Sequence, residues 1–376
     1  MSTDRRNFIK KTASLAAATS LGSLGNLMAN TAPPEDAVTG YVKDAGMQLS
    51  EAYFRGMEEK RIAFTKQLGV LGAVTGVKIT GDLKPWDPEA ITANKEAWEK
   101  IGLKWNVVEG PPALSEKTKL GLEGRDEEIS NFITFMKNLK QYGGVDVICY
   151  NWMPVIGWYR TNNANPGRGG ALMTAFDYDD VKNEPDTKYG KVSKETLWKN
   201  LEYFLKAVMP EAEKIGMKLA MHPDDPQVNS IKGIERIMTS VDNFERMMRI
   251  YPSTYNGVTL CQGNFSLMGV DIPKLVRKWG KNKIHFVHFR NVRDLSGNKP
   301  STKFTETFHD DGQIDMYAAM KSYYDIGFKG PIRPDHVPCM ATDTNDFPGY
   351  SNIGILFALG YIRGLMESVS KEKLKK

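Results

Sequence analysis

The chain has 376 residues, a length that one barrel of alternating strands and helices can reach. Of these residues 41% are hydrophobic and 25% charged, which is a composition typical of globular proteins. The formal net charge is only +5, and neither a basic face nor an acidic tail stands out, which argues against nucleic acid as the principal partner. Beyond the N-terminal region no apolar run in the sequence is long enough to cross a bilayer, so we expect no stable membrane anchor.

The first 32 residues predict a targeting segment. Arg5 and Arg6 precede a weakly apolar stretch rich in Ala, Ser, Gly and Leu, and this pattern resembles a twin-arginine signal. An amphipathic N-terminal helix is the alternative. The signal predicts that the twin-arginine export machinery is a partner and that the mature protein is periplasmic, with residues 33–39 as a linker.

Along residues 40–370, extended apolar runs alternate with amphipathic stretches of helical period. The predicted strands begin near Gly46, Val70, Leu103, Val145, Lys218, Gly257, Ile284 and Pro331. The predicted helices cover 55–68, 89–101, 126–141, 194–214, 231–250, 313–326 and 352–368. This alternation predicts an α/β fold, a single-domain (β/α)8 TIM barrel, with a doubly wound open sheet as the alternative. A homo-oligomer is compatible with the sequence.

In a TIM barrel the catalytic residues lie at the C-terminal ends of the strands. Polar or ionisable residues end one predicted strand after another here: Glu109, Asn151, His222, Cys261, His288 with Arg290, and Asp335 with His336. Two longer irregular stretches, 110–124 and 152–190, follow strands and are expected to lie over the same end of the barrel.

Four of these residues, His222, Cys261, His288 and Asp335, combine two imidazoles, a thiolate and a carboxylate, a set suited to a divalent transition ion. Each comes from a different strand, whereas the ligands of a structural zinc site are usually closely spaced along the chain. The spacing therefore predicts a catalytic metal site. His285 lies three residues before His288, so strand alternation predicts that it points to the other face and packs in the outer layer.

The stretch His222-Pro-Asp-Asp-Pro226 predicts a strand end followed by a turn that the two prolines constrain. Asp224 or Asp225 is expected to orient the ligand or to contact substrate. A solvated turn that caps a following helix is the alternative.

The segments "MHPDDP", "CQGN", "IHFVHFRNV", "FHDDGQIDM" and "RPDH" occur in this order, and together they resemble the mannonate dehydratases, which are related to the xylose-isomerase-like barrels. The resemblance implies the loss of water from D-mannonate, giving 2-keto-3-deoxy-D-gluconate, with Mn²⁺ or Fe²⁺ bound by the four ligands above. It implies that His336 and Tyr350 are the proton-transfer pair. The residues expected to contact the sugar acid are Glu109, Asn151, Arg160, Asp224, Arg290 and His309.

The chain departs from the family pattern at the rim of the expected site. Val337 and Pro338 follow His336 where the family usually has Gly-His, and Gly157 stands where an acidic residue is common. These departures favour a closely related aldonate as an alternative substrate. A metal-dependent sugar isomerase or epimerase and a non-catalytic sugar-acid binder are the alternative functions.

Overall fold

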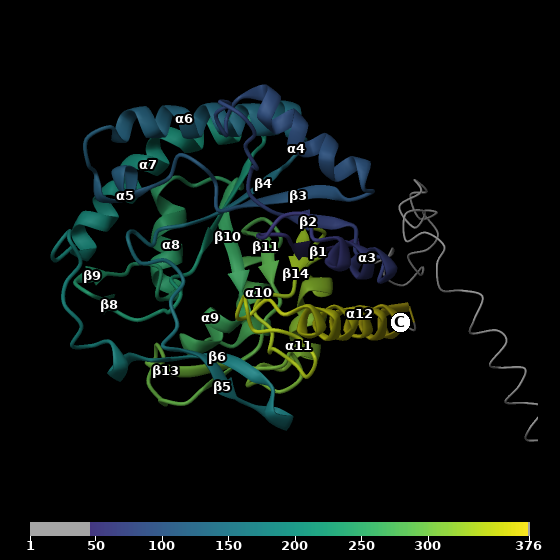
Figure 1. Cartoon of the computed structure of the whole chain (residues 1–376). Helices are drawn as coiled ribbons and strands as arrows, with labels where there is room; N and C mark the ends of the chain where they lie inside the picture. The colour runs from purple at the N-terminus through teal and green to yellow at the C-terminus, as the bar shows by residue number, and fades with distance from the viewer. Residues whose placement is uncertain (1–45, 375–376) are drawn as a thin grey trace, which may run out of the picture.

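The computed structural model describes residues 46–374, and within this range eight parallel strands close into one barrel (Figure 1). The strands are β1 (Gln48–Ala52), β2 (Gly72–Val74), β3 (Lys104–Glu109), β4 (Val147–Asn151), β7 (Lys218–His222), β10 (Asn256–Cys261), β11 (Ile284–His288) and β14 (Pro331–Arg333). The predicted TIM barrel is confirmed, and every predicted strand is present. The predicted signal and linker segments, 1–32 and 33–39, lie outside the described residues.

Helices surround the barrel and bury their apolar faces against the strands (Figure 1). They are α3 (Glu59–Gln67), α4 (Pro88–Lys100), α5 (Glu116–Leu120), α6 (Arg125–Asn138), α7 (Lys194–Ile215), α8 (Val241–Ile250), α9 (Gln262–Leu267), α10 (Ile272–Trp279), α11 (Met316–Asp325) and α12 (Asn352–Leu374). In α7 the Oγ of Ser193 accepts a hydrogen bond from the backbone N–H of Thr196, which fixes the first turn. Phe204 on the same helix is fully buried, and its truncation to Ala is expected to cost about 3–5 kcal/mol.

The predicted helix 231–250 is shorter than expected. Its first part forms a hairpin of β8 (Ser230–Ile231) and β9 (Ile234–Glu235), and α8 starts only at Val241. The two loop residues, Lys232 and Gly233, both have positive φ, 50° and 80°, which is the conformation of a tight two-residue hairpin turn. The tight turn at Lys232 and Gly233 therefore prevents the helix that the spacing of the apolar residues predicts here.

A second sheet lies beyond the carboxyl ends of the barrel strands, on the side to which the arrows of β10 and β11 point (Figure 1). Its strands are β5 (Asn162–Pro166), β6 (Leu172–Asp177), β12 (Val292–Asp294) and β13 (Lys303–Glu306), in the order β12-β13-β6-β5. The stretch 152–190 thus covers the barrel mouth as predicted, but it does so with ordered strands. Phe176 and Phe304 pack together in the small core beneath this sheet.

One strand irregularity changes the direction of His285. The pairing of β10 with β11 shifts from Val258 opposite Ile284 to Thr259 opposite Phe286, which leaves His285 as an extra residue. A Cβ added at Gly257 would lie 2.4 Å from His285 Nε2, so this glycine admits the imidazole. Gly257 pairs with Ala220, which belongs to the core inside the barrel. His285 therefore lies inside the amino end of the barrel, and its predicted place in the outer layer is wrong.

Contrary to the expectation that no later apolar run is long enough to cross a bilayer, α12 in the described chain passes that test by length and composition alone. Residues including Ile355, Leu359, Ile362 and Met366 are buried, and the helix packs beside α11 and α3. A core helix of a globular domain passes the same test.

Candidate metal centre and active site

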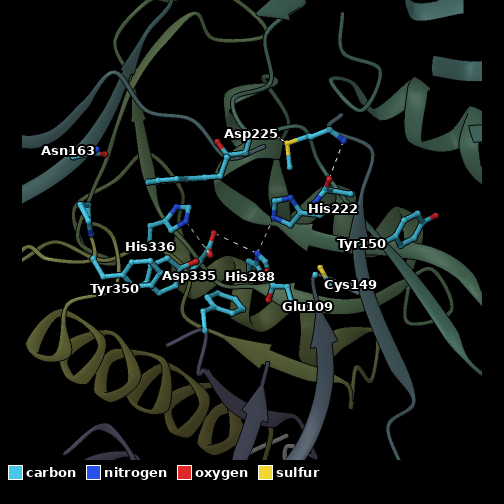
Figure 2. A pocket seen from close by; sticks show the side chains of 17 residues that line it. Glu109, Cys149, Tyr150, Asn163, His222, Asp225, His288, Asp335, His336 and Tyr350 are labelled. Atoms are coloured by element: carbon cyan, nitrogen blue, oxygen red, sulfur yellow. Dashed lines mark hydrogen bonds and ion pairs between the residues drawn. The ribbon is translucent and has the colours of Figure 1, made fainter. Parts of the chain in front are cut away.

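Three of the predicted metal ligands, His222, Cys261 and His288, have donor atoms within 4.8 Å of one another at the carboxyl end of the barrel. Asp335 lies beside them, and Figure 2 shows it next to His288. His222 Nε2 lies 3.2 Å from His288 Nδ1, which lies 3.6 Å from Asp335 Oδ2. Cys261 Sγ also lies 3.6 Å from Asp335 Oδ2. The parallel register pairs Cys261 with His288, which explains why ligands from distant parts of the chain reach the same level of the barrel.

The other nitrogen of each histidine faces an acceptor. His222 Nδ1 lies 2.7 Å from the carbonyl oxygen of Pro223, so this nitrogen carries the hydrogen and Nε2 presents its lone pair to the centre. His288 Nε2 lies 3.4 Å from Glu109 Oε1. Metal-binding histidines commonly have such a carbonyl or carboxylate behind them, which fixes the ring and its tautomer.

Ion pairs surround the centre below the cavity. Arg333 contacts both Glu109, at 2.9 and 3.1 Å, and Asp335, at 3.0 Å. Arg290 Nη1 lies 2.9 Å from Asp225 Oδ2 and 3.0 Å from Asp335 Oδ2.

Glu306 completes this set of buried charges. Arg290 Nε lies 3.0 Å from Glu306 Oε2, and the Arg160 guanidinium bridges Glu306 and Asp225. Among the described side chains of the site, four carboxylates, Glu109, Asp225, Glu306 and Asp335, thus lie against three guanidinium groups, Arg160, Arg290 and Arg333. The His288 imidazole lies between Glu109 and Asp335.

The pKa shifts follow from these buried charges. Burial and Arg333 lower the pKa of His288, but Glu109 and Asp335 outweigh them and raise it to about 10. Burial, together with the charge of His288, lowers the pKa of His222 to about 4. Although burial raises the pKa of Glu109, Arg333 and His288 bring it down to about 2. Glu109 and Asp335 thus favour a positive charge at the position of His288.

A cavity of about 370 Å³ opens above the centre. The predicted site residues in its wall are Glu109, Asn151, His222, His288, Asp335, His336 and Tyr350. The rings of His336 and Tyr350 lie 5.3 Å apart, edge to face, and point into this space (Figure 2). Cys261 is fully buried and lies beneath the cavity wall.

Hydrogen bonds hold the two predicted proton-transfer residues. His336 Nδ1 lies 2.9 Å from Glu306 Oε1, which leaves Nε2 on the cavity side. The backbone carbonyl of Tyr350 accepts a 2.5 Å hydrogen bond from Arg61 Nη2, and Arg61 also pairs with Glu51 at 3.3 Å. Burial raises the pKa of the Tyr350 phenol well above its ordinary value.

Four residues predicted to contact substrate do not line the cavity: Arg160, Asp224, Arg290 and His309. Arg160 and Arg290 are engaged in the buried ion pairs. Asp224 accepts a 2.7 Å hydrogen bond from the backbone N–H of Met238 and faces Arg236 at 3.4 Å, so it holds the chain after β7. His309 is fully buried, and burial lowers its pKa to about 4.

Of the two adjacent aspartates that the sequence offered, Asp225 and not Asp224 reaches the cavity. Other residues of the site escaped the sequence argument, among them Trp158 and Cys149, which also line the cavity. Arg333 begins the "RPDH" segment, so a signal was present in the sequence. Glu306 had no such signal, because it reaches the site only through the pairing of β13 with β6 above the barrel.

The similarity to known proteins covers nearly all of the described chain. The family described as D-mannonate dehydratase (UxuA) matches residues 47–189 and 183–376. The chain belongs to this family. The mannonate dehydratase of Streptococcus uberis is 38% identical over 330 residues, covering 81% of this chain and 92% of that protein. The family and the enzyme class predicted from the sequence, a carbon–oxygen lyase, are therefore confirmed.

Solved structures agree with the sequence comparison. The crystal structure of the mannonate dehydratase of Streptococcus suis serotype 2 superimposes with a TM-score of 0.78 at 33% identity, covering 87% of this chain and 94% of that one. A xylose isomerase domain protein from Planctomyces limnophilus reaches a TM-score of 0.55 at 11% identity. The second likeness shows the shared barrel fold alone.

The predicted periplasmic location is wrong. Mannonate dehydratase 2 of Halalkalibacterium halodurans is 33% identical over 356 residues, and the match covers 100% of that protein but 86% of this chain. The match thus accounts for the whole of that relative and leaves no additional export segment in it. Membership of the family therefore does not support a periplasmic location.

Proposed function

We propose that the chain removes water from D-mannonate or a closely related aldonate, giving a 2-keto-3-deoxy sugar acid. His222, Cys261, His288 and Asp335 would hold Mn²⁺ or Fe²⁺, which when bound acts as a Lewis acid toward oxygens of the substrate. The observation that carries the proposal is that His222, His288 and Asp335 line the same cavity as His336 and Tyr350, with the Cys261 sulfur 3.6 Å from Asp335.

The separations between the donor atoms fit a divalent ion. Donor atoms that share an ion at about 2.0–2.3 Å are separated from each other by roughly 3.2–3.8 Å, and the observed separations are 3.2 and 3.6 Å. A set of imidazole, sulfur and carboxylate donors also suits a divalent transition ion.

His336 is suited to accept the proton at C2 of the substrate. Its Nδ1 donates to Glu306, so Nε2 presents a lone pair to the cavity. The Asp335 Oδ1 atom lies 3.8 Å from Nε2, which places this lone pair beside the ligand set. Glu306 is thus a positioning residue that selects the basic nitrogen.

Tyr350 is suited to protonate the hydroxyl that leaves C3. Burial keeps its phenol protonated at neutral pH, so it is available as a hydrogen donor. Arg61 holds its backbone through the carbonyl oxygen. Histidine as base and tyrosine as acid then act from neighbouring points of the cavity wall.

The test is an assay of the purified protein, loaded separately with Mn²⁺ and with Fe²⁺, on D-mannonate and on its C2 epimer D-gluconate. We expect a 2-keto-3-deoxy product from D-mannonate at least about 100-fold faster than from the epimer, because the C2 proton of the epimer faces away from His336. An isomerised or epimerised sugar without water loss would contradict the proposal, and so would binding without turnover.

A further inference from the structure

A second cavity lies at the opposite end of the barrel from the catalytic site. We call it the amino-end cavity; it has a volume of about 410 Å³, and its wall includes Gln48, Lys104, Asn106, Lys218, His285 and Lys329. Most of these residues lie in or beside the first residues of β1, β3, β7, β11 and β14. Lys218 and His222 begin and end the same strand, so the length of the barrel separates this cavity from the metal ligands.

The wall of this cavity is strongly basic. Lys104, Lys218, Lys281 and Lys329 line it together with a single acidic side chain, Asp146, among the described residues. Asp146 is already paired, because its Oδ1 lies 2.5 Å from Lys140 Nζ. None of the four lysines has an ion-pair or side-chain hydrogen-bond partner among the described residues. A concave surface with charges of one sign concentrates ions of the opposite sign.

The cavity also contains a buried histidine. His285 is only 2% exposed, and no side chain of the described residues hydrogen-bonds to its ring. Burial, followed by the charges of Lys218 and Lys283, lowers the pKa of His285 to about 3, so the ring is neutral and carries one N–H.

We propose that the amino-end cavity binds a small multivalent oxyanion, carrying either a phosphate group or two carboxylates. The lysine ammonium groups would pair with its charges, and the His285 N–H would donate to one oxygen. A monovalent sugar acid would use less of this charge, so the ligand differs in chemistry from the substrate of the catalytic cavity. This inference does not depend on the proposed function.

The test is calorimetric titration of the full chain with inorganic phosphate and, separately, with succinate, at an ionic strength held constant with sodium chloride. We expect saturable binding of one of the two anions. The double variant Lys104→Gln/Lys218→Gln should weaken this binding at least about tenfold, since it removes two of the four lysine charges in the cavity wall. The preferred anion distinguishes a phosphate ligand from a dicarboxylate.

Lys199→Gln is the matched control, because Lys199 is an exposed lysine of α7 that lines neither cavity. This control should bind the anion as the unchanged protein does, and both variants should keep their turnover of aldonate. Saturable binding that survives in the double variant would overturn the inference, because the anion would then lie elsewhere. Absence of saturable binding of both anions up to about 10 mM would overturn it as well.

Discussion

Glu306→Gln tests whether the carboxylate behind His336 selects the nitrogen that accepts the proton. Glu306 Oε1 lies 2.9 Å from His336 Nδ1 and can only accept a hydrogen bond there. The amide of a glutamine has the same shape but can donate. Donation to Nδ1 would move the hydrogen of the ring to Nε2, on the cavity side, and the imidazole would lose its lone pair toward the substrate.

The expected loss follows from this change of tautomer. A positioned base contributes about 10²–10⁴ in rate, and a histidine held in the wrong tautomer by an amide loses up to about 10⁴ in kcat. We therefore expect kcat to fall by about 10²–10⁴. KM should change less than about threefold, because Glu306 lies behind His336 and does not line the cavity. The free energy of unfolding should fall by about 1–3 kcal/mol, since Asp225 still pairs with Arg160 and Arg290.

The assay measures steady-state formation of the 2-keto-3-deoxy product, with the metal content of each preparation determined in parallel. Glu306→Asp, which still only accepts, should retain more activity than Glu306→Gln. Glu202→Gln is the matched control, because Glu202 forms an exposed ion pair with Lys206. If Glu306→Gln kept its metal and a kcat within about threefold of the unchanged protein, the reasoning about the tautomer would be refuted.

Four further predictions concern other parts of the chain. His336→Ala and Tyr350→Phe should each keep the metal and lose about 10²–10⁴ in kcat. Metal analysis and steady-state kinetics of both variants will check this, and unchanged turnover would show that the two residues do not transfer protons. Cys261→Ala should lose metal and activity together in a titration of metal against rate, and full activity with a full metal complement would exclude the thiolate as a ligand. Asp224→Ala should lower the free energy of unfolding by about 1–3 kcal/mol with little change in KM, because Asp224 accepts a backbone hydrogen bond away from the cavity. A raised KM at unchanged stability would instead indicate that Asp224 contacts the substrate. Burial raises the pKa of Glu51 to about 7 from an ordinary value of 4.5. The protonated form of Glu51 therefore contributes stability that is fully present below about pH 4.5 and is lost as the pH rises through about 7. Denaturant unfolding of Glu51→Gln should therefore show a flatter decline between these two pH values, and an identical pH profile in both proteins would contradict the shift.

The sequence alone was enough to predict the barrel and to group the four predicted metal ligands at its mouth. Strand periodicity marks where each strand ends, and in a closed parallel barrel all these ends face one mouth. His222, Cys261, His288 and Asp335 could thus be grouped without any knowledge of contacts, although long stretches of chain separate them. The chemistry of their donor atoms then pointed to a divalent ion.

For residues that lie outside the barrel strands, only the tertiary structure shows which side chains face the cavity. Asp224 and Asp225 are adjacent in a turn, and the conformation of that turn directs one to Met238 and the other to the cavity. Glu306 reaches His336 because an antiparallel sheet folds over the barrel mouth, and a single sequence carries no periodic signal for that pairing. His285 points inward because the pairing of two strands slips by one residue, and such a slip reverses the face that strand alternation predicts.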